Sequence, residues 1–154
     1  MTTHKISQEY ANDLIFELEK AFWDERGKGM RFRVTTVGRQ FFSRKVLPQL
    51  PSTEIEGMIP TVEAALKAEG IVTQVTAERD GRLLRVRIVG CAHRPVEDRL
   101  VAAGGKPYTC VPANLIVLAV EEKLDRPAEL AEIKLVDGAC EVLLVLFDQR
   151  PFLG

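Results

Sequence analysis

Two aspartate–glycine pairs, each set between runs rich in β-branched and aliphatic residues, limit what this chain can fold into more than any other feature of its sequence. Asp80-Gly81 lies inside IVTQVTAERDGRLLRVRIV, and Asp137-Gly138 lies inside AEIKLVDGACEVLLVLF. The Asp-Gly pair is favoured in the tight type I′ turn that joins two antiparallel strands. The sequence therefore predicts two β-hairpins that turn at these pairs.

The apolar pattern agrees with both turns. When each Asp-Gly pair forms the loop, the mainly apolar residues of each hairpin share one face of the strands, which we expect to pack on the core. In the first hairpin the expected opposite pairs are Ala77 with Leu84, Val75 with Val86, and Thr73 with Ile88. In the second they are Leu135 with Cys140, Ile133 with Val142, and Ala131 with Leu144.

Helical patterns fill the rest of the chain. Apolar residues recur every four positions over 7–26, from Tyr10 to Phe22, and predict an amphipathic helix. Further helices are expected over 39–47, over 60–70 with Pro60 in the first turn and Gly70 as the C-terminal cap, from Pro95 onwards, and over 111–124. This order predicts an α+β fold, with an antiparallel sheet built from two β-hairpins, covered by helices, and with an N-terminal helical region. The pattern leaves open whether the two hairpins share one sheet.

Length and composition set the class of protein. The 154 residues suit a single domain, with an N-terminal helical region over 1–50 and an α+β core over 51–154. No apolar run approaches the roughly 20 residues that cross a bilayer, and the N-terminus carries no apolar signal-peptide core. With three cysteines, an odd number, we expect a cytoplasmic protein with no membrane partner. The net charge of −1 gives no general attraction to nucleic acid, and we interpret the basic segment 26–45 as a solvated face.

The three cysteines are the candidate metal-binding or reactive residues. Cys91 ends the first hairpin, Cys110 precedes a helix whose N-terminus would stabilise a thiolate, and Cys140 opens the last strand. His93 is a candidate fourth ligand, and Glu132 or Asp137 a candidate oxygen donor for zinc. Strict alternation sends Cys91 to the face opposite Leu84, Val86 and Ile88 unless Gly90 ends the strand. Two alternatives stay open: three buried core cysteines, and a nucleophilic Cys–His pair.

The C-terminal half resembles a known family. GCAHRPVED, PYTCVPANLIVLAVEEKLDRP and LAEIKLVDGACEVLLVL follow one another from Gly90 onwards. This order of strand, cysteine, helix, second cysteine, apolar helix and closing hairpin resembles the ligand-sensing domain related to 4-vinyl reductases, also called the hydrocarbon-binding domain. It is also similar to the C-terminal sensor half of iron–sulfur-biogenesis repressors.

The resemblance implies a site and a function. It implies an iron–sulfur cluster or zinc held by Cys91, Cys110 and Cys140, with His93 or Glu132 as supplementary ligand. It also implies an apolar pocket between the sheet and the helix over 111–124; the residues expected there are Leu115, Leu118, Ile133 and Val142.

We therefore expect a small metal- or ligand-sensing domain rather than an enzyme. No winged-helix pattern precedes the domain, so its output would pass through a homo-oligomer or a partner protein, with the N-terminal helix as a candidate surface. The alternatives are a metal-free small-molecule-binding or scaffold module of the same fold with core cysteines, and a Cys–His hydrolase or reductase.

Overall fold

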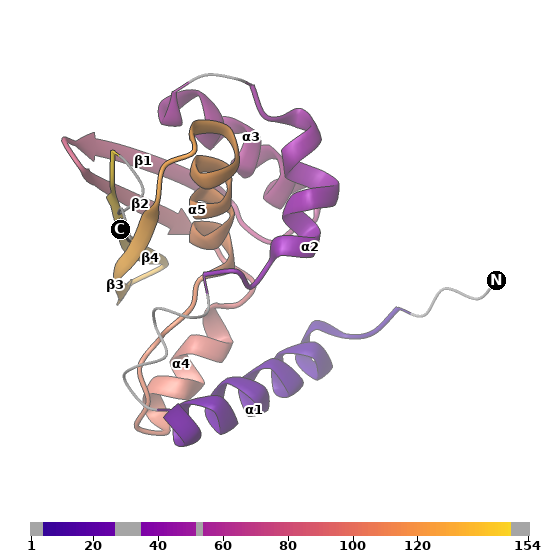
Figure 1. The fold of residues 1–154 in the computed structure, drawn as a ribbon. Coiled ribbons are helices and arrows are strands. Elements are labelled where there is room, and N and C mark those ends of the chain that lie inside the picture. Colours follow the sequence, from indigo (N-terminus) through magenta and orange to yellow (C-terminus); the bar gives the residue numbers. More distant parts are fainter. Residues whose placement is uncertain (1–4, 27–34, 52–53, 149–154) are drawn as a thin grey trace.

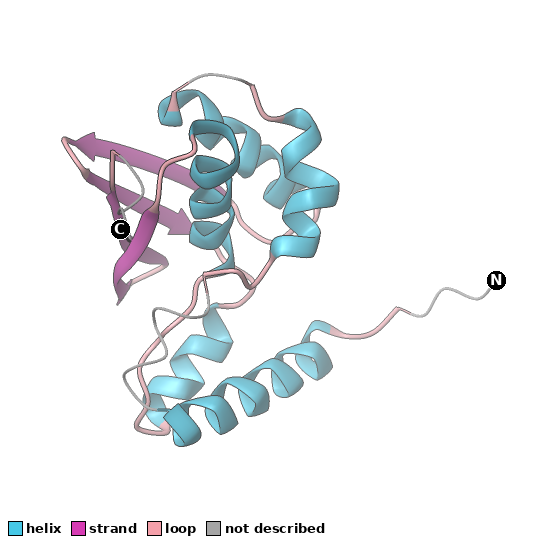
Figure 2. Cartoon of the chain, viewed as in Figure 1, coloured by secondary structure: helices cyan, strands magenta, loops and turns pink. Residues whose placement is uncertain are grey.

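The α+β fold expected from the sequence is confirmed. The computed structural model describes residues 5–26, 35–51 and 54–148, and part of the basic segment 26–45 therefore lies outside the described residues. Helices and β-hairpins alternate along the chain, and the strands of both hairpins form one antiparallel sheet (Figures 1 and 2). The helices are α1 (Gln8–Arg26), α2 (Arg39–Phe41), α3 (Ile55–Ala68), α4 (Arg94–Ala102) and α5 (Val111–Leu124). Two short helical turns, η2 (Phe42–Val46) and η3 (Leu47–Gln49), follow α2, and the strands are β1 (Gln74–Asp80), β2 (Leu83–Val89), β3 (Ala128–Val136) and β4 (Ala139–Leu146).

Both hairpins belong to the same sheet. The strand order is β1-β2-β4-β3, and all neighbours are antiparallel. The second strand of each hairpin lies in the middle, where Ile88 of β2 is opposite Cys140 of β4. This pairing settles the question that the sequence left open, and it brings the end of the first hairpin beside the start of the last strand.

The second hairpin turns where the sequence predicts. Leu135 lies opposite Cys140 and Ile133 opposite Val142, as expected. The expected pairing of Ala131 with Leu144 is wrong, because a bulge follows Leu130 and Leu130 itself lies opposite Leu144. One extra residue at a bulge shifts the register beyond it and leaves the turn unchanged.

The first hairpin has the predicted faces but a different register. Ala77 lies opposite Val86, and Val75 opposite Ile88, each two positions further along β2 than predicted. Asp80 pairs with Leu83, so the loop is Gly81-Arg82. Gly81 has φ +60°, whereas Arg82 does not have a positive φ. A type I′ turn needs positive φ at both central residues and a type II′ turn only at the first, so the turn is of type II′ and the predicted type I′ turn is wrong. A shift of two residues keeps every side chain on its own face.

Two of the predicted helices have different limits. Helix α3 begins already at Ile55, so Pro60 lies inside it on its exposed side rather than in its first turn. Burial of Ile55, Met58 and Ile59 extends the apolar face in that direction. The helix expected over 39–47 is divided into α2, the π-helical turn η2 and the 3₁₀ turn η3.

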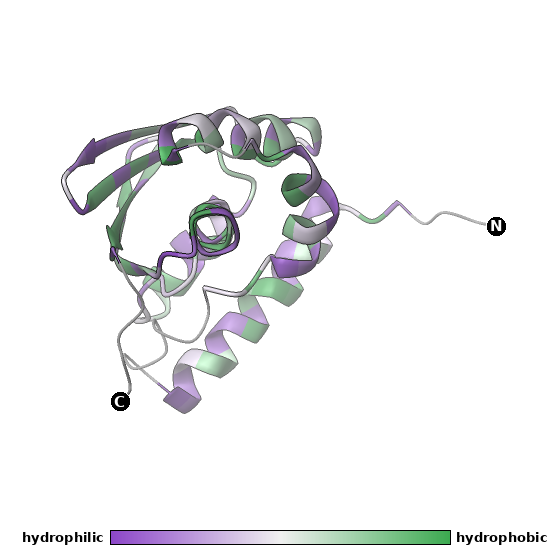
Figure 3. Ribbon diagram, turned by 45° about the horizontal axis from the view of Figure 1, so that its top comes forward, coloured by the Kyte–Doolittle hydropathy of each residue, from purple (hydrophilic) through white to green (hydrophobic). Residues whose placement is uncertain are grey.

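Helix α5 is the centre of the core. In Figure 3 it is seen end-on between the sheet on one side and α3 and α2 on the other. Its residues from Pro112 to Val120 are all buried, which agrees with the absence of a polar face in its sequence. The buried side chains of α3 and of the inner face of the sheet pack around it.

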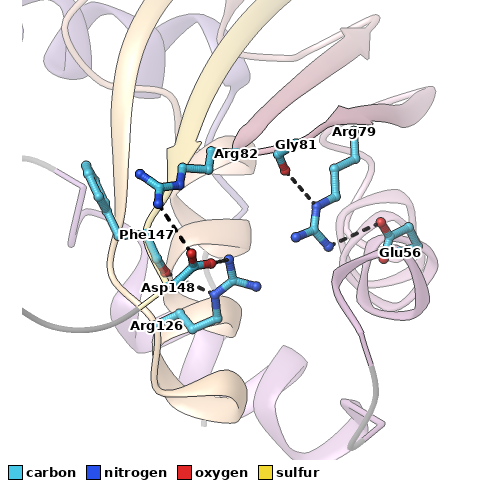
Figure 4. Close-up of polar contacts among 7 residues, drawn as sticks. All are labelled: Glu56, Arg79, Gly81, Arg82, Arg126, Phe147 and Asp148. Atoms are coloured by element: carbon cyan, nitrogen blue, oxygen red, sulfur yellow. Dashed lines mark hydrogen bonds and ion pairs between the residues drawn. The ribbon is translucent and has the colours of Figure 1, made fainter.

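Ion pairs surround the end of the sheet that carries the Gly81-Arg82 turn. Figure 4 shows Asp148 between Arg82 and Arg126, at 3.4 Å and 3.0 Å, while Arg79 lies 3.6 Å from Glu56. Exposed ion pairs of this kind contribute little to stability. The candidate chemistry lies at the other end of the sheet, where β2 ends and β4 begins.

Helix α1 packs mainly on α4, and Figure 1 shows this pair apart from the sheet. Ser7 Oγ accepts a hydrogen bond from the Tyr10 amide and so caps the predicted helix. The apolar side chains that recur every four residues are nevertheless exposed: Tyr10, Leu14, Leu18 and Phe22, at 44% to 70%. The packed side of α1 carries Asn12, Phe16 and Trp23 instead. Among the described residues, no helix combines the length and apolar character that crossing a bilayer needs.

Candidate ligand-binding cavity

A cavity of about 370 Å³ lies where α1, α4, the start of α5 and the end of the sheet meet. Ile15, Leu18 and Phe22 form its α1 wall, and Ile133 of β3 closes the sheet side. The segment Tyr108–Pro112 forms a third wall. All three cysteines line this one cavity, so the structure brings together the thiols that the sequence singled out.

Gly90 explains how Cys91 reaches the cavity. Strand β2 ends at Val89, and Gly90 then has φ +66°, a left-handed conformation that glycine adopts without strain. The chain turns, the Ala92 amide donates to the carbonyl of Ile71 at 2.7 Å, and Cys91 packs against the core. The alternation of β2 therefore ends before Cys91.

The other two thiols come from separate elements. Cys110 is the N-cap residue of α5, and its carbonyl accepts from the Asn114 amide at 2.8 Å. Cys140 lies near the start of β4, between Ile88 and Leu135. All three cysteines are free thiols.

Burial keeps these thiols protonated. It raises the pKa of Cys91 to about 11 and also raises the pKa of Cys110 and Cys140. At Cys140 the nearby Arg94 guanidinium opposes this effect. For Cys110 the loss of solvent outweighs the N-terminus of α5, so the expected stabilisation of a thiolate there is wrong for the metal-free protein.

His93 lines the cavity but contacts Cys91 through its backbone. Its amide donates to Cys91 Sγ at 3.4 Å, and burial lowers the pKa of the imidazole. A neutral imidazole beside a protonated thiol is the reverse of the ion pair that activates a nucleophilic cysteine. The pKa shifts of Cys91 and His93 therefore do not support the predicted Cys–His hydrolase or reductase.

The remaining predicted residues lie elsewhere. Glu132 is exposed on the outer face of β3, one residue from Ile133, which does line the cavity. Leu115, Leu118 and Val142 are buried in the packed core instead. The apolar pocket lies at the N-terminal end of α5, rather than along its side as expected.

The thiols do not form a ready set of metal ligands. Among the described residues, no group of three or more His, Cys, Asp or Glu side chains is arranged to hold a metal ion. Cys91, Cys110 and Cys140 share a cavity, but coordination would need them to approach one another and to lose their protons. The zinc or iron–sulfur site remains a prediction.

Two glutamates in the cavity were missed by the sequence analysis. Glu19 of α1 and Glu97 of α4 both line it, and their side chains hydrogen-bond to each other. Burial, and for Glu97 also the charge of Glu19, raise the pKa of Glu97 to about 9. Burial likewise raises the pKa of Glu19 to about 7. Ionising both of two adjacent buried carboxyls is unfavourable, because the two charges repel each other away from solvent. At neutral pH the pair therefore shares a proton.

A sequence signal for this pair exists. Glu19 stands four residues after Ile15 and four before Trp23, inside the apolar stripe of α1. Glu97 stands between Val96 and Leu100, the buried residues of α4. An acid at an apolar position of an amphipathic helix indicates either a misread face or a functional group.

Arg94 was also missed. Its guanidinium donates to the carbonyls of Val136 and Ala139, both at 2.7 Å, and pairs with Asp98 at 2.8 Å. It therefore fastens the start of α4 to the turn between β3 and β4. This contact fixes Glu97 and Cys140 in the same wall.

Comparisons with family models, with curated proteins and with solved structures find no match to this chain. The assignment of function consequently depends on the cavity and on its residues.

Proposed function

We propose that this chain is a binding domain for a small apolar molecule, held in the cavity between α1, α4 and the end of the sheet. The cavity itself supports the proposal: its volume of about 370 Å³ lies in the range of small-molecule sites. Its walls are mainly apolar side chains with a few polar groups, the composition typical of such sites. The resemblance to hydrocarbon-binding domains implies the same class of ligand.

Helix α1 connects the ligand to the surface. Ile15, Leu18 and Phe22 line the cavity, and Leu18 and Phe22 are also part of the exposed apolar stripe. A ligand would therefore contact the same helix that faces outward. We propose that the signal passes through α1 to a second copy or a partner protein, and that the protein works in the cytoplasm, where three unpaired thiols are stable.

Filling the cavity tests the proposal. We expect the wild-type protein to bind the uncharged fluorophore N-phenyl-1-naphthylamine, and Ile133→Trp to weaken this binding at least about tenfold, because the indole would occupy the space of the ligand. Lys134→Trp, on the exposed face of the same strand, is the matched control and should bind as the wild type does. Fluorescence titration measures both. Equal affinity in the two variants, or no binding by the wild type, would contradict the proposal.

A metal site at the three thiols is a second candidate function. Its supporting observation is that Cys91, Cys110 and Cys140 reach one cavity from three different elements. If zinc or an iron–sulfur cluster is the natural occupant, protein purified anaerobically without a histidine tag should carry about one zinc ion, or show visible absorbance from a cluster. Cys140→Ser should lose it. Metal-free wild-type protein, with thiols that react rapidly only after unfolding, would eliminate this candidate and leave the apolar site.

A further inference from the structure

The carboxyl pair in the cavity has acceptor atoms without donors. Glu97 is only 8% exposed, and its Oε2 is buried without a hydrogen-bond partner in the described part of the chain. The same is true of Glu19 Oε1 on the facing helix. Buried polar atoms in folded proteins are nearly always hydrogen-bonded, so two orphaned oxygens at one cavity need an explanation.

The neighbouring cations do not supply the missing donors. Arg94 is held by Asp98 and by two carbonyls of the β3–β4 turn. Arg99 pairs with Asp13 on the outside of the α1–α4 contact, at 2.8 Å. Tyr108 donates its hydroxyl to the backbone carbonyl of Glu19 at 2.8 Å, not to a carboxyl oxygen. The two carboxyls therefore form an acidic site among apolar side chains, and the nearby arginines Arg94 and Arg99 are already paired with other groups.

We propose that Glu19 and Glu97 bind the head group of the ligand, and that this ligand is an apolar molecule carrying a protonated amine. The inference rests on the proposed function, and adds the chemical class of the ligand to it. An ammonium group has three N–H donors, enough to reach both orphaned oxygens, and its charge balances one carboxylate. The apolar body would lie against Ile15, Leu18 and Phe22.

Binding would exchange one proton for the ammonium ion. Without ligand, the shared proton holds the pair at one negative charge. With the ammonium ion between them, both carboxyls can ionise, the proton leaves to solvent, and the net charge of the site is unchanged. The other titratable groups around the pair act on the same equilibrium; they are Asp98, His93, Arg94 and Cys91 of the β2–α4 side, Tyr108 and Cys110 of the loop before α5, and Cys140 of β4.

Octylamine and 1-octanol have the same apolar chain and differ in their head group, so comparing their affinities isolates the contribution of the ammonium group. We expect calorimetry at pH 7 to show octylamine binding at least about tenfold more tightly than 1-octanol, since hydrogen bonds to charged groups are worth that much. Its heat should vary with the ionisation enthalpy of the buffer, by about one released proton. Glu97→Gln and Glu19→Gln should each abolish the preference for the amine, so that octylamine binds no more tightly than 1-octanol. Glu17→Gln, an exposed position of the same helix, is the control.

The outcomes distinguish the inference from the function it extends. If the wild type binds octanol as tightly as octylamine, or if both glutamine variants keep the preference, the inference fails while the apolar site stands. If neither compound binds, the proposed function itself fails. Circular dichroism checks that the two variants are folded, and two separate single substitutions keep the test valid if one of them unfolds.

Discussion

Replacing Gly90 with alanine is expected to lower the free energy of unfolding by about 2 to 5 kcal/mol. Gly90 has φ +66°, where a residue with a Cβ is strained by roughly 1 to 2 kcal/mol. The added Cβ would also lie 2.2 Å from Oγ1 of Thr73 and 3.0 Å from its Cβ, so the backbone or Thr73 must move. Overpacking of this kind typically costs about 1 to 3 kcal/mol more.

Gly138→Ala is the matched control for this experiment. Gly138 has a similar φ of +72°, but a Cβ there meets nothing within 4 Å, so it measures the backbone strain alone. Urea unfolding of both variants gives the difference that is due to the contact with Thr73. Adding Thr73→Ala to the Gly90 variant should recover part of the loss. Equal destabilisation of the two glycine variants would show that the contact has no effect.

The free energy of unfolding is expected to fall as the pH rises from 7 to 9, because of Glu19 and Glu97. Burial raises the pKa of both carboxyls above the usual 4.5, to about 7 and about 9. In this range the folded chain therefore holds protons that the unfolded chain has already lost. Stability is fully present below pH 4.5 and is lost as the pH passes the raised values, by up to about 1.4 kcal/mol per pH unit for each proton.

Glu97→Gln should remove most of this pH dependence. The glutamine amide donates to Glu19 without needing a proton, so the variant should be more stable than the wild type at pH 9. Glu17→Gln, which leaves the buried pair intact, should follow the wild-type curve. His93, whose lowered pKa acts below this range, does not interfere. The cysteines contribute as the pH approaches 9, because the unfolded thiols lose their protons there and the buried ones keep them, but this contribution is common to all three proteins. The difference between the curves therefore reports the carboxyl pair. Parallel curves for Glu97→Gln and the wild type would exclude the carboxyl pair as the cause.

The sequence predicts the sheet well because its information is local. An Asp-Gly pair between alternating strands is enough to predict each hairpin and its buried face. The pattern cannot distinguish the predicted pairing of Val75 with Val86 from the observed pairing with Ile88, because a shift of two residues preserves both faces. Nor does it indicate the bulge after Leu130, which changes the register without changing the composition of the strand.

The site was only partly predictable for a different reason. The cysteines stand out in the sequence by their rarity and by their positions at element ends, and they do meet at one cavity. The carboxyl pair depends on α1 packing against α4 through the side that holds Asn12 and Glu19. Periodicity favours burial of the Leu14–Leu18 side instead, and that side is exposed. Only tertiary packing decides between the two sides of such a helix.

The pairing of β2 with β4 also determines when the cavity can form during synthesis. Leu83 of β2 pairs with Val145, far along the chain, so the first hairpin leaves the ribosome well before β4, the neighbour of β2 in the sheet. Until then β2 presents an open hydrogen-bonding edge, which other extended chains can join. Contacts so far apart in the chain also slow folding. The wall that carries Cys91 and Cys140 is therefore completed last, and a chain that stops before β4 would be prone to aggregate and would lack this wall of the cavity.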